Sequence, residues 1–205
     1  MPKPSILIVG AGIAGLTLAA SLDHSRYNID MIEKRENIHM PGSAICIPAN
    51  AAACLNLLGI LDDILDHAYT VGKWEIFSHS GKYLYTKHAK SFCQKMPFLC
   101  VRRQILHHFL RECCASVTIS LNTRIEAITE AYEKVNVILS GGQMKAYDLV
   151  IGADGIYSSV RQKVDPLVSV NPLKAFCWRS IVINDAGITS PCFYLDRKAP
   201  TQTRM

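Results

Sequence analysis

The hydrophobic and polar positions at the start of the chain follow a strand-helix-strand order. Residues 5–9 form an apolar run rich in β-branched side chains, which predicts a buried parallel strand. Apolar positions over residues 13–22 predict a largely buried helix, and residues 28–33 alternate as a second strand. This order predicts an α/β fold that opens with parallel strands.

The pattern changes over the following hundred residues. Two helices are predicted first, then a hairpin around Ser80-Gly81, then another helix. Three short alternating segments come next and predict an antiparallel meander, after which a buried strand leads into a last helix. The predicted elements are helices over 51–58 and 60–65, strands over 73–77 and 82–86, a helix over 102–113, strands over 117–121, 125–127, 135–139 and 147–151, and a helix through Arg161.

The composition mainly excludes classes of protein. The chain has 205 residues, of which 49% are hydrophobic and 19% charged, which excludes a disordered chain. Its net charge is +5, but the basic residues are dispersed, so we expect no nucleic-acid partner. Beyond the first helix, no apolar run approaches the roughly 18 residues that cross a bilayer, so no integral membrane segment is expected.

Two other features bear on the location of the protein. The apolar stretch 6–20 closes on small residues and imitates a signal peptide, but a leader needs only apolar length and gives no reason for three regularly spaced glycines. The eight cysteines, from Cys46 to Cys192, contain no C-x-x-C pair, and the histidines lack the spacing of metal ligands. We therefore expect a cytoplasmic protein with mostly reduced thiols and no metal site.

The glycines between the first strand and helix have the spacing of a dinucleotide-binding turn. Gly10 would permit the tight turn, Gly12 the approach of a diphosphate to the backbone, and Gly15 the close packing of helix on strand. Glu33 ends the second strand close to the spacing of about 20 residues expected for an acid that binds ribose hydroxyls. A 2′-phosphate there would meet like charge, so the pattern favours FAD or NAD over NADP.

Taken in order, these motifs resemble the N-terminal part of the FAD-dependent monooxygenases of the flavoprotein aromatic hydroxylase type, with the p-hydroxybenzoate hydroxylase fold. The resemblance covers nearly all of the chain and begins with residues 10–16 and with Glu33-Lys34. Segment 42–45 is similar to the family's flavin-approach segment, and residues 101–106 are similar to its arginine-helix motif. Its most specific signal is Gly152-Ala153-Asp154-Gly155, which resembles the family's second fingerprint.

The resemblance implies an architecture and a set of cofactor contacts. The fold is expected to be α/β, a Rossmann-like FAD-binding domain with an antiparallel β-meander plus an incomplete mixed-sheet substrate domain. The FAD-binding domain would cover 1–70 and 99–165, and the partial substrate domain 71–98 and 172–205, with Ala175 to Arg179 as its first strand. The cofactor-binding residues implied are Gly10, Gly12, Ala14, Gly15, Glu33, Lys34, Ile45, Arg103, Ile125 and Asp154.

Three of these residues have implied roles that differ from simple packing. Arg103 would reach the phosphate side of FAD, because its guanidinium donates two parallel hydrogen bonds. The backbone of Ile125 would touch adenine, and Asp154 would order the loop near the diphosphate. No catalytic acid, base or nucleophile is implied.

The activity that the resemblance implies is hydroxylation of a small, aromatic or unsaturated molecule with NAD(P)H and O2. The family's third signature, a Gly-Asp motif, does not occur before Met205, so we expect a truncated enzyme or a short relative. A strand over 190–196 without a partner would then expose an edge, which predicts marginal stability or self-association. Two alternatives stay open: a non-catalytic fragment that binds FAD or NAD, and an NAD-dependent dehydrogenase.

Overall fold

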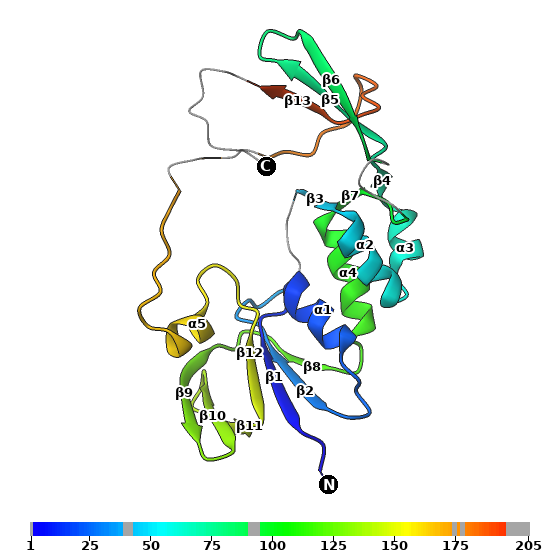
Figure 1. Ribbon diagram of the computed structural model, residues 1–205. Helices are drawn as coiled ribbons and strands as arrows, with labels where there is room; N and C mark the ends of the chain where they lie inside the picture. Colours follow the sequence, from blue (N-terminus) through cyan, green and yellow to red (C-terminus); the bar gives the residue numbers. More distant parts are fainter. Residues whose placement is uncertain (1, 39–42, 90–94, 174–175, 177–178, 196–205) are drawn as a thin grey trace. The chain divides into compact units, whose positions relative to one another are not determined.

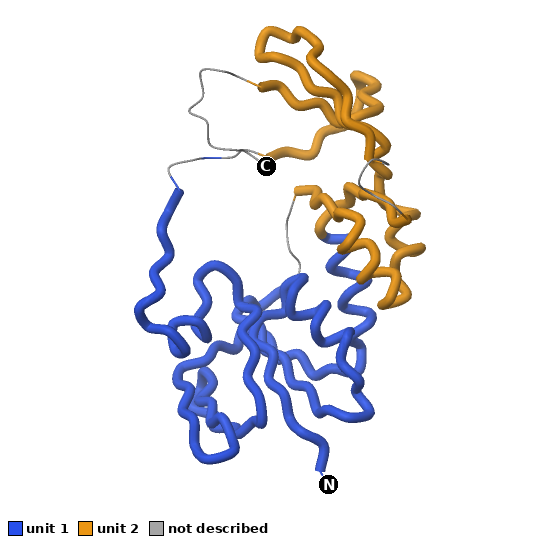
Figure 2. The backbone as a smooth tube through the Cα atoms, viewed as in Figure 1, with its two compact units in different colours: residues 1–42, 104–178 blue, residues 43–103, 179–205 orange. Residues whose placement is uncertain are grey.

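The computed structural model describes residues 2–38, 43–89, 95–173, 176 and 179–195. The chain divides into two compact units, each built from two separate stretches (Figure 2). Unit 1 comprises 1–42 and 104–178, and unit 2 comprises 43–103 and 179–205. Both contain strands, and helices lie beside them, so the predicted α/β class is confirmed (Figure 1).

Unit 1 contains a four-stranded sheet in which every neighbouring pair is parallel. Its strands, in sheet order, are β12 (Leu149–Gly152), β1 (Ser5–Val9), β2 (Asn28–Ile32) and β8 (Thr118–Ser120). Helix α1 (Ile13–Ser21) connects β1 to β2. The carboxyl ends of these parallel strands therefore meet at one edge of the sheet, where ligands bind in open α/β folds.

The position of β8 corrects one expectation. The segment 117–121 was expected to begin the antiparallel meander, and this was wrong, because β8 pairs in parallel with β2. The physical reason is that a strand of three residues has too short an alternation to indicate the direction of its partner. The outcome matters for Glu33, since the Glu33 N–H donates to the Ser120 carbonyl oxygen over 2.9 Å.

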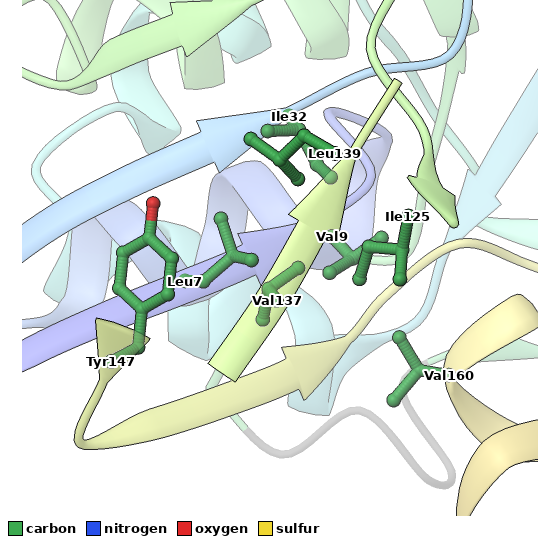
Figure 3. Packing of buried hydrophobic residues seen from close by; sticks show 8 residues of the cluster. All are labelled: Leu7, Val9, Ile32, Ile125, Val137, Leu139, Tyr147 and Val160. Atoms are coloured by element: carbon green, nitrogen blue, oxygen red, sulfur yellow. The ribbon is translucent and has the colours of Figure 1, made fainter. Parts of the chain in front are cut away.

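A three-stranded antiparallel sheet covers one face of β1. Its strands are β9 (Ile125–Ala131), β10 (Lys134–Leu139) and β11 (Met144–Tyr147). Figure 3 shows the core between the sheets, made of Leu7, Val9, Ile32, Ile125, Val137, Leu139, Tyr147 and Val160. Ile8 points the other way and lies beside Gly15 of α1. Because side chains alternate along a strand, β1 is buried on both faces.

Polar contacts at the rim tie the antiparallel sheet to the parallel one. The Asp148 carboxylate accepts hydrogen bonds from Lys134 Nζ (2.6 Å) and from the Ser5 N–H (2.7 Å), which together hold the pKa of Asp148 well below its usual range. The Tyr147 hydroxyl donates to Asp30 Oδ2 over 2.8 Å, and burial followed by this contact raises the pKa of Tyr147. The sheet that carries Ile125 is thus fixed to both β1 and β2.

The described residues of unit 2 form two small sheets and two short helices. The first sheet, in order, consists of β3 (Ala44–Ile47), β7 (Leu99–Arg102) and β4 (Tyr69–Thr70). The second consists of β13 (Cys192–Leu195), β5 (Lys73–Ser78) and β6 (Tyr83–His88). The helices are α2 (Ala49–Leu57) and α3 (Leu61–Leu65). The hairpin predicted around Ser80-Gly81 is confirmed by the antiparallel pairing of β5 with β6.

The end of the described chain corrects a second expectation. A strand over 190–196 was expected to lack a partner, and this was wrong, because β13 pairs in parallel with β5 from Cys192 to Leu195. The physical reason is that the hairpin offers a second edge on β5, which β13 occupies. Self-association stays a prediction that rests on the outer edges of this sheet. Of the predicted strand from Ala175 to Arg179, only Phe176 and Arg179 lie within the described residues, and neither is in a strand.

Two more helices complete the described elements. Helix α4 (Arg103–Cys113) follows β7 directly, and α5 (Ser159–Val164) follows the loop after β12. Within the described ranges, no helix combines the length and apolar character needed to span a bilayer.

Candidate functional site

The carboxyl end of β1 turns sharply at Gly10. Its φ of +107° is strained for any residue with a side chain, and a Cβ there would lie 2.5 Å from the Ala153 carbonyl oxygen. The Gly10 N–H donates to the Ile32 carbonyl oxygen over 2.8 Å, and the Ala153 N–H donates to the Val9 carbonyl oxygen over 2.8 Å. The turn after β1 is therefore packed against the loop after β12.

The next two glycines of the turn have opposite surroundings. A Cβ at Gly15 would lie only 1.9 Å from the Gly10 carbonyl oxygen. The first turn of α1 therefore packs so closely on the Gly10 backbone that no side chain fits at position 15. Among the described residues, a Cβ at Gly12 would meet no atom within 4 Å. Gly12 is also the N-cap of α1; no side chain in the described part of the chain caps this helix, and its first turn contains no acidic residue. The positive end of the helix therefore faces space at Gly12 that an anion could occupy.

Glu33 is held against this turn. One carboxylate oxygen, Oε2, accepts a hydrogen bond from the Ala11 N–H over 2.9 Å, and Oε1 accepts from the Arg35 N–H over 3.1 Å. A carboxylate offers about four acceptor positions, so both oxygens keep capacity for further donors. Glu33 is only half-buried, which leaves that capacity accessible. The structure thus brings Glu33 to the glycine turn, as its spacing predicted.

Asp154 lies in the loop between β12 and α5. Its Oδ2 accepts from the Ser159 N–H (2.6 Å) and from Ser159 Oγ (2.9 Å). Burial acts to raise the pKa of Asp154, but hydrogen bonds from Ser158 and Ser159 outweigh it and lower the pKa. Oδ1 is buried and, within the described residues, has no hydrogen-bond partner. An ionised carboxylate with one unused buried oxygen therefore stands in the loop that touches Gly10.

Sequence reasoning missed His107 on α4. This residue is only 5% exposed, and its Nε2 lies 2.9 Å from the Ala11 carbonyl oxygen. Because a carbonyl oxygen only accepts hydrogen bonds, Nε2 must carry the proton. Ala11 is thus held on both sides, by Glu33 at its N–H and by His107 at its carbonyl. The available signal was a polar residue between Leu106 and Leu110, the buried positions of the helix.

We expect the substitution His107→Leu to lower the free energy of unfolding by about 1–3 kcal/mol, because the buried Ala11 carbonyl would lose its donor. His107→Gln keeps an N–H donor of similar reach and should lose clearly less. Denaturant unfolding measures both changes, with the exposed neighbour substituted as His108→Gln for control. Equal losses for the leucine and glutamine variants would show that packing, rather than the hydrogen bond, holds this position.

The remaining predicted residues lie in varied places. Ala14 and Lys34 are exposed near the turn, and Ile125 begins β9 in the buried core. Ile45 lies on β3 opposite Val101, and Arg103 begins α4. The Arg103 Nε is buried, and within the described chain no group hydrogen-bonds to it. Gly42, at the start of the predicted flavin-approach segment, lies outside the described residues.

The chemistry available at this edge of the sheet is binding. The open helix terminus suits a diphosphate, and the accessible oxygens of Glu33 suit hydroxyl donors. Among the described residues, no cluster of three or more histidine, cysteine, aspartate or glutamate side chains could hold a metal ion.

Comparison with known proteins assigns a family. A family model described as an FAD binding domain matches residues 3–195. A 2-heptyl-3-hydroxy-4(1H)-quinolone synthase of Pseudomonas aeruginosa is 30% identical over 178 residues, which make up 87% of this chain and 47% of the relative. A flavin-dependent monooxygenase of Legionella longbeachae is 29% identical over 160 residues, 78% of this chain and 41% of the relative.

Solved structures agree with these matches. The tetrameric form of 2-methyl-3-hydroxypyridine-5-carboxylic acid oxygenase is similar with a TM-score of 0.70 and 28% sequence identity. The similarity covers 80% of this chain and 43% of that one. The chain therefore spans somewhat less than half the length of the relatives it matches.

Proposed function

Because the chain belongs to the FAD binding domain family, we propose that the turn 10–15 of unit 1 binds the diphosphate of FAD. We further propose that the protein works as an FAD-dependent monooxygenase on a small aromatic or unsaturated molecule, with NAD(P)H as electron donor. The matched relatives favour this activity over the NAD-dependent dehydrogenase and the non-catalytic fragment. The proposed FAD-binding domain is discontinuous, over 1–70 and 99–165, with the partial substrate domain over 71–98 and 172–205.

The observation that carries the proposal is the fixed orientation of the Ala11–Gly12 peptide group beside the open space at Gly12. His107 holds the Ala11 carbonyl from the buried side over 2.9 Å. In a trans peptide the carbonyl and the following N–H point in opposite directions, so the Gly12 N–H is turned away from His107. The described residues leave space free at Gly12, where none of their atoms would lie within 4 Å of a Cβ. This arrangement supports a fixed donor directed at a phosphate.

The other residues of unit 1 support the two ends of the same ligand. Glu33 would accept hydrogen bonds from the ribose hydroxyls with the oxygen capacity that Ala11 and Arg35 leave unused. Asp154 would keep its loop in place beside the diphosphate through Oδ2, while Oδ1 is available to a donor on the ligand or a bound water. Lys34 and the backbone of Ile125 are proposed at the adenosine end.

Ile45 and Arg103 of unit 2 are proposed as further cofactor contacts. The Arg103 Nε is buried and has no acceptor among the described residues, and a buried guanidinium N–H gains from an anionic acceptor. Bound FAD would supply the redox and oxygen chemistry, while the residues of this chain bind and orient it. The names of two matched proteins refer to a quinolone and to a pyridine, which supports the aromatic side of the substrate proposal.

The proposal is tested first by binding. The purified chain is titrated with FAD, and flavin fluorescence and ligand-induced stabilisation are recorded. We expect saturable binding by the wild-type chain. Binding of NAD with no binding of FAD would overturn the proposal and favour a dehydrogenase, and binding of neither would overturn it altogether.

The substitution Glu33→Gln tests the ribose contact. It removes the charge and places an amide NH2 against either the Ala11 or the Arg35 N–H, so we expect FAD affinity to fall by about 1–3 kcal/mol, or about fivefold to 150-fold. Glu36→Gln, an exposed change on the same loop, is the matched control and should bind as the wild type does. If the Glu33 variant retains full affinity, Glu33 has no part in the site.

A further inference from the structure

The pairing of β3 with β7 sets two cysteines opposite one another. Cys46 lies on β3 and Cys100 on β7, and the antiparallel register makes them direct partners. Both are free thiols, Cys46 exposed and Cys100 half-buried. Both strands belong to unit 2, so this juxtaposition depends on one compact unit alone.

The hydrogen bonds of the ladder identify which kind of pair the cysteines form. The Arg103 N–H donates to the Ser43 carbonyl oxygen over 3.3 Å, so these two residues, next in register, are a hydrogen-bonded pair. Hydrogen-bonded and non-hydrogen-bonded pairs alternate along an antiparallel ladder. Cys46 and Cys100 lie three pairs further along this ladder, so they form a non-hydrogen-bonded pair. In pairs of this kind the two side chains are closest to each other.

The geometry of such a pair suits a disulfide. Its Cα atoms are about 4.5 Å apart, and disulfides span Cα separations of about 4.4–6.8 Å. The two side chains also interact with each other. Burial is the main cause that raises the pKa of the Cys100 thiol, and the charge of Cys46 and a hydrogen bond with Cys46 raise it further. Since Cys46 is exposed, an oxidant in solution meets Cys46 first.

We propose that Cys46 and Cys100 form a disulfide when the protein meets hydrogen peroxide. The Cys46 thiolate attacks a peroxide oxygen, an S–O bond forms as the O–O bond breaks, and the departing hydroxide takes a proton to leave as water. The Cys100 sulfur then attacks the Cys46 sulfur, an S–S bond forms as the S–O bond breaks, and the hydroxyl leaves with the Cys100 proton as a second water. Two thiols thus give two electrons to one peroxide, and a dithiol reductant reverses the change.

The disulfide would join the two strands that carry the proposed cofactor residues of unit 2. Ile45 is the neighbour of Cys46 on β3, and β7 leads directly into Arg103 at the start of α4. Oxidation would therefore fix β3 against β7 in this register. The bond itself requires no flavin, so its formation is independent of the proposed function.

The test is a mass measurement on the full chain. The reduced protein is treated with one equivalent of hydrogen peroxide and digested without reductant. We expect an intact mass lower by two hydrogen atoms, a crosslinked peptide that joins Cys46 to Cys100, and reversal of both by dithiothreitol. An unchanged mass, a crosslink to a different cysteine, or sulfinic acid on Cys46 beside a free Cys100 thiol would overturn the proposal.

Three variants separate the pair from general thiol reactivity. Cys54→Ser removes another exposed thiol, on α2, and should leave the crosslink intact. Cys46→Ser should abolish it. Cys100→Ser should leave a sulfenic acid on Cys46 that dimedone traps, whereas trapping on Cys54 alone would show that Cys46 is not the residue attacked.

Discussion

Replacing Gly15 by alanine is expected to destabilise the protein by about 3 kcal/mol or more. Alanine favours a helix over glycine by about 1 kcal/mol, which works in the opposite direction. The steric effect is larger, because the new Cβ would lie 1.9 Å from the Gly10 carbonyl oxygen and both groups belong to the backbone. Either α1 moves away from the turn or the turn opens. Thermal and denaturant unfolding of the ligand-free chain measure the loss.

The control for this experiment lies three residues earlier in the same turn. Gly12→Ala introduces the same methyl group where no atom of the described chain lies within 4 Å, so the stability of the ligand-free chain should change by no more than about 1 kcal/mol. If Gly15→Ala unfolds at the same denaturant concentration as Gly12→Ala, then α1 does not approach the turn this closely.

Gly12→Ala is expected to have its large effect on FAD instead. Its methyl group would enter the space proposed for the diphosphate, next to the N–H that His107 helps to direct. We expect FAD affinity to fall at least a hundredfold, or about 3 kcal/mol, while the ligand-free melting curve stays close to that of the wild type. Fluorescence titration with FAD and a melt without ligand, made on the same preparation, separate the two effects.

A second glycine provides a matched control for binding. A Cβ at Gly72 would also meet no atom of the described residues within 4 Å, and Gly72 lies in unit 2, between β4 and β5. Gly72→Ala should therefore bind FAD with wild-type affinity. Unchanged affinity in Gly12→Ala as well would move the diphosphate away from this turn and remove the main support for the proposed function.

The start of unit 1 could be predicted from sequence because its signals are local. The run 5–9, the glycine turn and the alternation ending at Glu33 each depend on neighbouring residues, and they correspond to β1, the turn before α1, and β2. The hairpin around Gly81 was predictable for the same reason, since its φ of +82° favours glycine.

The misplaced elements depend on partners far away in the chain. Strand β8 is short, and only the free edge of β2 determines that it runs parallel. Likewise, β13 finds its place on an edge of β5 that is more than a hundred residues earlier. Local alternation contains no information on either partner.

His107 escaped prediction for a related reason. Its partner is a backbone carbonyl 96 residues earlier, and a carbonyl has no side-chain identity to read. The spacing of the glycines indicated the turn after β1. The position of Glu33 at the end of the second strand indicated that its carboxylate lies beside this turn. What keeps the Ala11 peptide in one orientation becomes visible only when α4 and the turn are seen together.

The order of the strands in the parallel sheet has a consequence for synthesis of the protein. Strand β1 is made before one of its two neighbours, β12, which begins at Leu149, and the Ala153 carbonyl against which Gly10 packs comes later still. A nascent chain emerging from the ribosome therefore holds β1 without one of its two sheet neighbours until the residues of β12 have also been translated. During that interval the Gly10 turn lacks the Ala153 carbonyl that packs against it, and one edge of the apolar strand β1 stays open to chaperones that bind unpaired strands.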